Sequence, residues 1–174
     1  MSPKVDNSPD RKQQILAAAA LLFAEQGYYK TTTADVARAV GVTQPYVFHF
    51  FKSKEALYLA VLKQASERIL HAFTFVDAPP KMLPEAMGRA FNALLKDYRS
   101  EILLVMMAYA TPEPAVREYT RAEFDVVFER VKSRFEEAGL PDANAQASMF
   151  IAQGLIVSLS EVLNLPKLCM WHDE

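Results

Sequence analysis

The chain has 174 residues, about half of them apolar, so it can bury a sizeable core in one domain or in two smaller ones. Glycine is scarce and good helix formers are common, which favours an all-helical fold. The single cysteine, Cys169, excludes an intrachain disulfide and suits a reducing cytoplasm. We find no signal-peptide pattern at the polar N-terminus. The most apolar stretch, residues 149–163, is shorter than a membrane span and is interrupted by polar residues, so no membrane partner is expected.

The charge is unevenly distributed along the chain. Residues 1–63 carry eight Lys and Arg against five Asp and Glu, whereas residues 64–174 carry eleven against sixteen. The overall net charge of −2 therefore hides a mildly basic front and an acidic rear. This division is typical of a two-part protein that contacts nucleic acid with one end.

Apolar residues at helical spacing predict a first helix that begins soon after Pro9 and ends at Gly27, followed by a short loop. Thr32 lies three residues before Asp35, which is a capping-box pattern with Asp in place of Glu or Gln. This pattern predicts the start of a short second helix. Gly41, which tolerates positive φ, is expected to end that helix.

A third short helix is expected to start at Thr43, which can cap it, with Pro45 in its first turn. It should end near residues 51–52. Ser53 then caps a long fourth helix, over residues 54–75. The rear of the chain predicts four more helices, at residues 84–98, 100–110, 114–138 and 142–163.

Two short helices joined by a tight turn that contains glycine form a helix-turn-helix, whose second helix presents its N-terminal residues to the major groove. Val47 and Phe51 share one face of this helix and suit the core. The residues expected to face outward are Gln44, Pro45, Tyr46 and His49. Gln44 can pair with adenine in a bidentate manner. Donors for phosphate are expected near helix N-termini, at Thr32, Thr33, Thr43 and Lys54.

Residues 11–62 resemble the DNA-binding domain of the tetracycline-repressor (TetR) family. Several separate motifs agree in spacing: LFAEQGY, the Thr pair before Asp35-Val36-Ala37, Gly41-Val42-Thr43, Phe51 and Ser53-Lys54-Glu55. The resemblance implies base or backbone contacts by Thr43, Gln44 and Tyr46, a phosphate or base contact by His49, and a phosphate contact by Lys54. Phe48 departs from the pattern, which usually has Tyr there, so a hydroxyl donor to phosphate is absent.

The resemblance also implies an overall plan. A DNA-binding domain over residues 10–53 is joined by the long fourth helix to a helical ligand-binding and dimerisation domain over residues 54–174. The protein is then a cytoplasmic homodimeric regulator, expected to repress transcription from a near-palindromic operator on double-stranded DNA. A small apolar or amphipathic effector of unknown identity is expected to release it.

Candidate pocket residues lie on the helices that enclose the ligand in that family: Phe73, Phe91, Leu95, Tyr98, Met106 and Tyr109. Their Met and aromatic character suits an adaptable apolar cavity. The last two helices carry apolar stripes on more than one side, which favours burial against a second subunit. The candidate dimer residues are Phe124, Phe128, Phe135, Met149, Ile156 and Leu159.

Other functions find little support in the sequence. Cys169 and His172 are three residues apart, but no second pair has metal-ligand spacing, so no metal site is expected. We see no catalytic constellation or phosphate-binding glycine loop and expect neither enzyme activity nor a cofactor. The alternative is a helical adaptor that uses the same hairpin to bind a protein.

Overall fold

The computed structural model describes residues 9–168, so Cys169 and His172 lie outside the described residues. The described chain contains α-helices and two 3-10 helices and no strand. The elements are α1 (Pro9–Lys30), α2 (Thr33–Ala39), α3 (Gln44–Phe50), α4 (Lys54–Thr74), η1 (Pro80–Met82), α5 (Leu83–Asp97), α6 (Arg99–Ala108), α7 (Pro114–Glu137), α8 (Ala143–Leu163) and η2 (Pro166–Leu168). The all-α fold class predicted from the sequence is confirmed.

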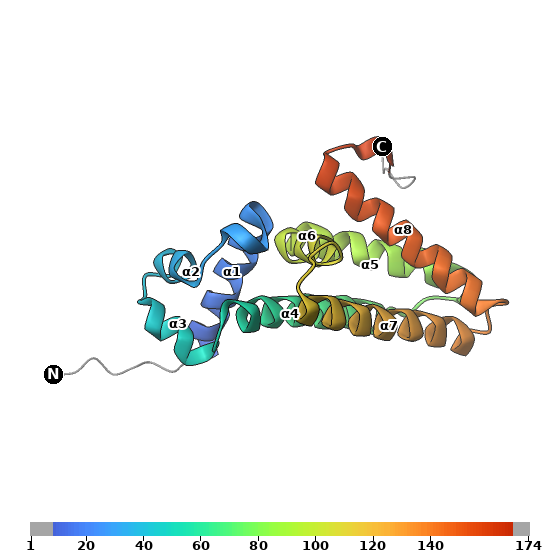
Figure 1. The fold of residues 1–174 in the computed structure, drawn as a ribbon. Helices are drawn as coiled ribbons and strands as arrows, with labels where there is room; N and C mark the ends of the chain where they lie inside the picture. The colour runs from blue at the N-terminus through green and yellow to red at the C-terminus, as the bar shows by residue number, and fades with distance from the viewer. Residues whose placement is uncertain (1–8, 169–174) are drawn as a thin grey trace.

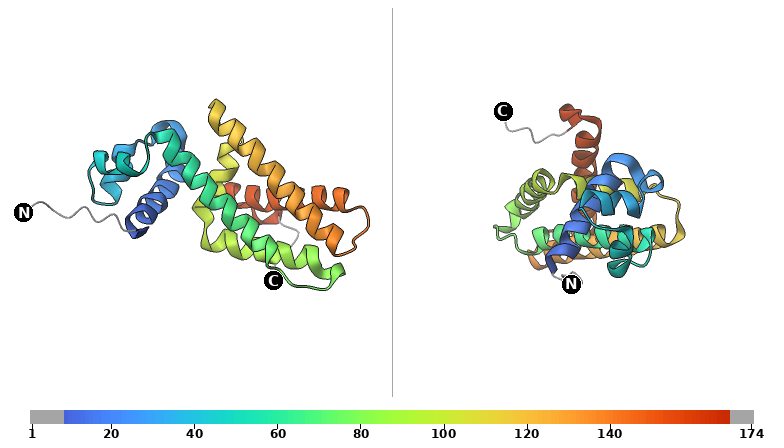
Figure 2. Two further views of the ribbon diagram at one scale, coloured as in Figure 1. Left: turned by 90° about the horizontal axis from the view of Figure 1, so that it is seen from below. Right: turned by 90° about the vertical axis from the view of Figure 1, so that its left-hand side faces the viewer.

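The molecule is elongated, with α1, α2 and α3 gathered at one end (Figure 1). We call these three helices the head. Helix α4 starts at the head and runs away from it beside α7, while α5, α6 and α8 complete the rear bundle (Figures 1 and 2). The head is therefore connected to the rear by one continuous helix, and α6 also packs on α1.

Most helix ends lie within one or two residues of the sequence prediction, because local signals set them. Ser53 caps α4 by accepting a hydrogen bond from the Ala56 backbone N–H at 3.0 Å. Asp142 accepts one from the Ala145 N–H at the start of α8. One expectation was wrong: Gly27 leaves the helical region at φ 79°, but residues 28–30 form another helical turn rather than a loop.

Two groups of buried apolar side chains form the core. The first joins the head to the beginning of α4, where Leu57, Tyr58, Val61 and Leu62 are buried, and extends to α6 and α7. The second lies at the far end of the rear bundle. The first group contains residues on both sides of the predicted boundary between residues 53 and 54, so the start of α4 belongs structurally to the head. The division of the chain into 10–53 and 54–174 stays a prediction.

Helix α8 has two apolar faces. One face packs on α7 and α5, with Phe150 and Ser158 buried. The other leaves apolar side chains exposed along its length: Met149, Ala152, Ile156, Leu159 and Leu163. Among the described helices, α8 alone is long and apolar enough to cross a membrane, so the sequence estimate of its apolar length was too short. That test uses length and composition only, and a core helix also passes it.

Candidate functional site

Helices α2 and α3 form the expected helix-turn-helix. Thr32 and Asp35 make the complete capping box: the Asp35 N–H donates to the Thr32 hydroxyl, and the Thr32 N–H donates to the Asp35 carboxylate at 3.1 Å. The Thr32 hydroxyl also donates to that carboxylate at 2.6 Å. Gly41 has φ 68° in the turn, and Val47 of α3 is fully buried against the head. The chain thus fixes α3 to α2 through both the turn and the core.

The outer surface of α3 is the candidate reading surface. Gln44, Pro45 and His49 are exposed, while Tyr46 is half-buried and makes an edge contact with the Phe50 ring at 5.4 Å. Phe48 is 38% exposed, so its ring is available for apolar contact. Tyr46 therefore has a packing role in addition to the outward role expected of it.

Thr33 is not a surface donor as expected, because it is buried at the start of α2. Its hydroxyl accepts a hydrogen bond of 2.8 Å from the side-chain amide of Gln44. A Gln amide has two N–H donors and one carbonyl acceptor. One donor is held by Thr33, which leaves one donor and the carbonyl oxygen, the pair that a bidentate contact with adenine requires. Thr33 thus positions Gln44.

Lys54 is also placed differently from its expected role as a phosphate contact. Its ammonium group donates to the backbone carbonyls of Tyr28 and Tyr29, at 3.0 and 3.4 Å, and lies 4.5 Å from the centre of the Tyr28 ring. Lys54 therefore ties the start of α4 to the last turn of α1, where exposed carbonyls favour a cation. No local pattern in the sequence indicates this contact, which joins residues 26 positions apart.

Thr43 occupies the N-cap position of α3 but makes no side-chain capping bond, contrary to expectation. Its side chain is exposed at the edge of the reading surface. The hydroxyl of Thr32, in contrast, is engaged with Asp35. Among the side chains expected to donate to phosphate, Thr43 is therefore the most accessible for such a contact.

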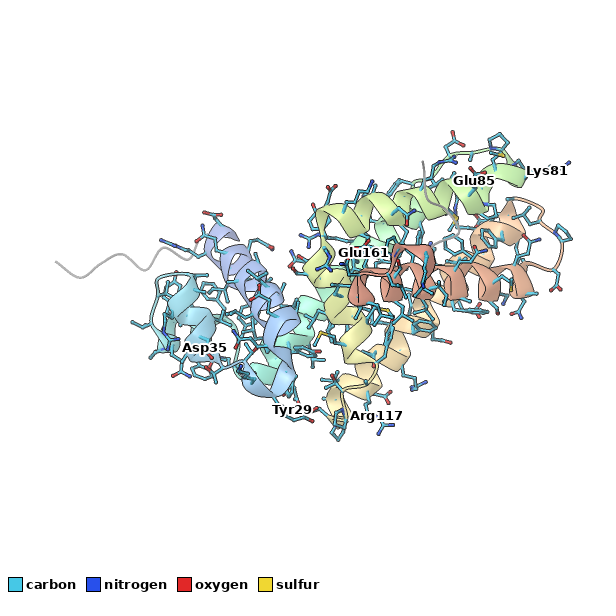
Figure 3. The ribbon with its side chains drawn as sticks, turned by 90° about the horizontal axis from the view of Figure 1, so that it is seen from above. Tyr29, Asp35, Lys81, Glu85, Arg117 and Glu161 are labelled. Atoms are coloured by element: carbon cyan, nitrogen blue, oxygen red, sulfur yellow. The ribbon has the colours of Figure 1, made fainter. Side chains whose placement is uncertain are left out.

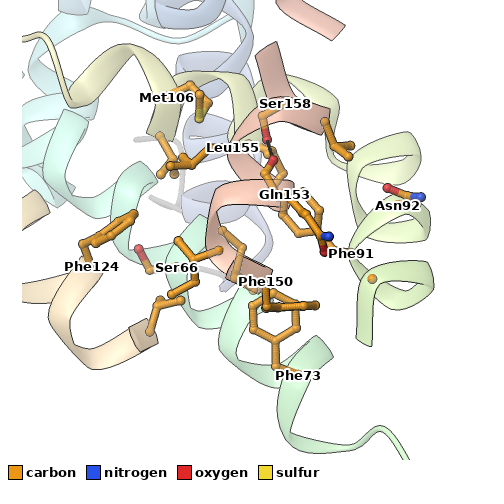
Figure 4. Close-up of a pocket in the computed structure, with 18 of the residues that line it drawn as sticks. Ser66, Phe73, Phe91, Asn92, Met106, Phe124, Phe150, Gln153, Leu155 and Ser158 are labelled. Atoms are coloured by element: carbon orange, nitrogen blue, oxygen red, sulfur yellow. Dashed lines mark hydrogen bonds between the residues drawn. The ribbon is translucent and has the colours of Figure 1, made fainter. Parts of the chain in front are cut away.

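The rear bundle encloses a cavity of about 650 Å³ between α4, α5, α6, α7 and α8 (Figure 4). Four of the predicted pocket residues line it: Phe73, Phe91, Met106 and Tyr109. Two do not. Leu95 is buried in the core, and the exposed ring of Tyr98 stacks under the Arg68 guanidinium at 4.1 Å. A cavity of this size suits a drug-sized organic ligand.

Helices α7 and α8 supply much of the cavity wall, although the apolar stripes of these helices predict a dimer interface instead. Phe124 lines the cavity, Phe128 is half-buried, and Phe135 is fully buried with its ring 5.8 Å from that of Phe150. The interface expectation for Phe135 is therefore wrong. Met149, Ile156 and Leu159 are instead 64%, 45% and 38% exposed.

Comparison with known proteins agrees with this architecture. The sequence model described as bacterial regulatory proteins, tetR family, matches residues 15–61. The HTH-type transcriptional repressor Rv1474c of Mycobacterium tuberculosis is 39% identical over 69 residues, 38% of this chain and 37% of that protein. The HTH-type transcriptional activator FasR of Mycolicibacterium smegmatis is 29% identical over 154 residues, 84% of this chain and 68% of that protein. The match to the repressor thus spans little more than a third of its length.

A solved structure has a similar fold. The crystal structure of AibR in complex with isovaleryl coenzyme A and operator DNA superposes with a TM-score of 0.70 at 22% identity, covering 86% of each chain. The fold and the head together define a helix-turn-helix, DNA-binding regulator of transcription. Residues 15–61 match the model of the tetR family of bacterial regulatory proteins, and the relatives named above are regulators of transcription.

Proposed function

We propose that the protein is a cytoplasmic homodimer that represses transcription by binding a near-palindromic operator, and that a small apolar or amphipathic effector in the rear cavity releases it. Residues 10–53, which include the head, read DNA, and residues 54–174 bind the effector and the second subunit. The observation that carries this proposal is that α4 and α6 take part in both regions. Each helix contributes buried residues to the head core and lining residues to the cavity.

The reading surface supports sequence-specific contact with DNA. Gln44 is exposed and oriented by Thr33, with Pro45 and His49 beside it on the same helix. Thr43 and the neighbouring α3 backbone are available to phosphate, whereas Thr32 acts mainly through its capping box. We assign Lys54 to holding α4 against α1 rather than to a direct phosphate contact.

The exposed face of α8 supports the homodimer. Met149, Ile156 and Leu159 lie on one exposed apolar stripe, and apolar stripes of this kind mark interaction surfaces in proteins. A twofold dimer pairs two heads, so the half-sites of the operator are expected about 34–36 Å apart or at a multiple of that distance. We therefore assign this face to a second copy of the chain rather than to a membrane.

Helix α6 supports the coupling between effector and DNA. Ile102, Val105 and Met106 line the cavity, while Leu104 and Ala108 are buried in the core group shared with α1. A ligand that prefers one position of α6 and α4 therefore shifts the heads, and the coupling is reciprocal. The long α4 was the expected connection, and α6 provides a second one.

The test is a gel shift with DNA selected from a random pool by the full chain, followed by a screen of small molecules for release. A salt-sensitive, sequence-selective shift that an effector abolishes supports the proposal. Equal binding to all DNA, or no binding, excludes the operator role and favours the protein adaptor. The relatives include a repressor and an activator. A promoter–reporter assay with and without the protein therefore tests whether it represses or activates transcription.

A further inference from the structure

The charged residues of the cavity lining belong to two separate parts of the fold, while the uncharged polar residues Asn92, Thr120, Gln153 and Ser158 also line the cavity. Lys81, Glu85 and Arg89 belong to η1 and the first half of α5, and Lys81 and Glu85 lie at the end of the molecule away from the head (Figure 3). The second set belongs to α4 and α7. We call it the inner polar end, and it consists of Ser66, Tyr119 and Glu123.

The inner polar end lies next to the head. Tyr119 packs against the core group that includes the head, and Leu62, one turn before Ser66 on α4, is buried in that group and also lines the cavity. Figure 4 shows Ser66 beside Phe124 on one side of the cavity, away from Asn92 of α5. A ligand group at this end therefore touches α4 close to where α4 enters the head.

The Tyr119 hydroxyl has no hydrogen-bond partner among the described residues although its oxygen is buried. Burial first, and the negative charge of Glu123 second, raise the pKa of Tyr119 to about 12. The nearby Ser66 hydroxyl acts to lower the pKa of Tyr119, but no hydrogen bond of ordinary geometry joins the hydroxyls of Ser66 and Tyr119. A buried hydroxyl without a partner is costly, so a ligand or water that pairs with it is favoured.

The charge at the inner polar end selects the kind of ligand group. Its charged side chain is the carboxylate of Glu123, and no Lys or Arg among the cavity-lining residues lies on α4 or α7. An anionic group placed there would be repelled by Glu123 and would lack a counter-ion in a mostly apolar cavity. A hydroxyl or an amino group meets acceptors at all three side chains.

We propose that the effector is an apolar molecule that carries an uncharged or cationic hydrogen-bond donor, a hydroxyl or an amine, and that this donor binds at Ser66, Tyr119 and Glu123. The inference rests on the proposed role of the cavity as the effector site. The apolar body of the ligand lies against the rings of Phe73, Phe91 and Phe150. Ser66, Tyr119 and Glu123 are then the residues that determine specificity.

The opposite orientation would place an anionic head group at Lys81 and Arg89, with an apolar tail pointing inward. Arg89 is already paired with Glu85 at 2.5 Å, and these two side chains are 62% and 42% exposed. Exposed charges are screened by water and salt and bind an anion weakly. The structure therefore favours recognition of the polar group at the inner end.

The experiment uses three probes that share a ten-carbon chain: 1-decanol, decylamine and decanoate. Their affinities for the full chain are measured by calorimetry near neutral pH. We expect the alcohol and the amine to bind about ten times more tightly than the carboxylate. Tyr119→Phe should weaken decanol binding about fivefold, the effect of one hydrogen bond, and leave decanoate unchanged. Ser66→Ala is a second variant with the same expectation.

Glu123→Gln and Arg89→Gln are matched variants, since each removes one charge from a different end. Because the Glu123 carboxylate attracts an ammonium group, decylamine should bind the wild type more tightly than decanol, and Glu123→Gln should abolish this preference. Arg89→Gln should leave all three affinities unchanged. Tightest binding by decanoate that Arg89→Gln weakens would overturn the inference, as would failure of every probe to bind. Operator binding is measured on the same preparations: its absence, with probe selectivity intact, overturns only the proposed function.

Discussion

The side-chain amide of Gln44 donates a hydrogen bond of 2.8 Å to the hydroxyl of Thr33, across the turn between α2 and α3. Through this bond Thr33, which is buried in the head, fixes the exposed side chain of Gln44 on the reading surface. Fixing a side chain in advance lowers the entropy cost of its contact with a base. Thr33 should therefore affect sequence selectivity without touching DNA.

Thr33→Val removes the hydroxyl and keeps the volume, so we expect operator affinity to fall about fivefold, the effect of one hydrogen bond, while affinity for random DNA is unchanged. Thr33→Ser should restore selectivity. Gln44→Ala removes the contact with the base altogether and is the reference variant, with an expected loss of roughly 1–3 kcal/mol of discrimination against the wrong base. Competition gel shifts measure the selectivity of all three variants for the operator over random DNA. If Thr33→Val is as selective as the wild type, the hydrogen bond between Thr33 and Gln44 has no role in reading DNA.

Lys54→Met keeps the apolar stem and removes the ammonium that binds the Tyr28 and Tyr29 carbonyls. We expect a lower melting temperature with little change in the salt dependence of DNA binding. Lys52→Met, at an exposed site two residues earlier, is the matched control and should leave the melting temperature unchanged. If Lys54→Met instead reduces the salt slope by about one unit, Lys54 contacts phosphate.

Ile156→Glu places a charge in the exposed apolar stripe of α8 and should convert the dimer into a monomer, because a buried unpaired charge opposes association. Leu21→Glu is the control, since Leu21 is 48% exposed on α1, away from the stripe. Sedimentation velocity at micromolar concentration distinguishes the two states. A wild-type chain that sediments as a monomer would contradict the dimer assignment.

Gly27→Ala should destabilise the protein by about 1–3 kcal/mol, since φ 79° with ψ 168° is a backbone conformation essentially restricted to glycine. The new Cβ would also lie 4.0 Å from Met107 of α6, whereas a Cβ at Gly41, with φ 68°, meets nothing within 4 Å. Gly27→Ala and Gly41→Ala are compared by thermal unfolding and by the release of DNA that the effector causes. Both variants carry backbone strain, but only Gly27→Ala adds an atom at the contact between α1 and α6. An equal loss of release in both variants would argue against α6 as a connection.

The capping box gives a dependence on pH. Hydrogen bonds from the Thr32 side chain and backbone hold the pKa of Asp35 below its ordinary value of 3.8. The ionised carboxylate therefore stabilises the head above pH 3.8, and this contribution is lost as the pH falls further. Thr32→Ala should lower the melting temperature by about 2–4 °C near neutral pH, with a smaller difference in acid. A difference that is constant with pH would contradict this account.

Local signals made much of the head predictable. The Thr32–Asp35 capping box, the positive φ of Gly41 and the burial of Val47 all follow from residues close together in the sequence. The role of Lys54 did not, because its acceptor carbonyl on Tyr28 is 26 residues away. Contacts at that separation depend on how helices pack, which a periodic pattern does not specify.

The rear bundle shows the same limit. Helical periodicity places Phe124, Phe128 and Phe135 on one stripe of α7, yet the structure distributes them between the cavity wall and the core. Periodicity identifies an apolar face but not the neighbour that covers it. The resemblance predicts Tyr98 in the pocket because it lies on a helix that encloses the ligand in that family, but its position at the end of α5 instead pairs it with Arg68.

The most direct test of the central claim is the affinity of the full chain for its selected operator and for random DNA, with and without Gln44→Ala. We predict that the wild type prefers the operator by at least about 10³-fold, the lower end for specific regulators, and that Gln44→Ala loses selectivity at one base position in each half-site. Equal affinity for both DNAs, unaffected by Gln44→Ala, would contradict DNA reading through α3.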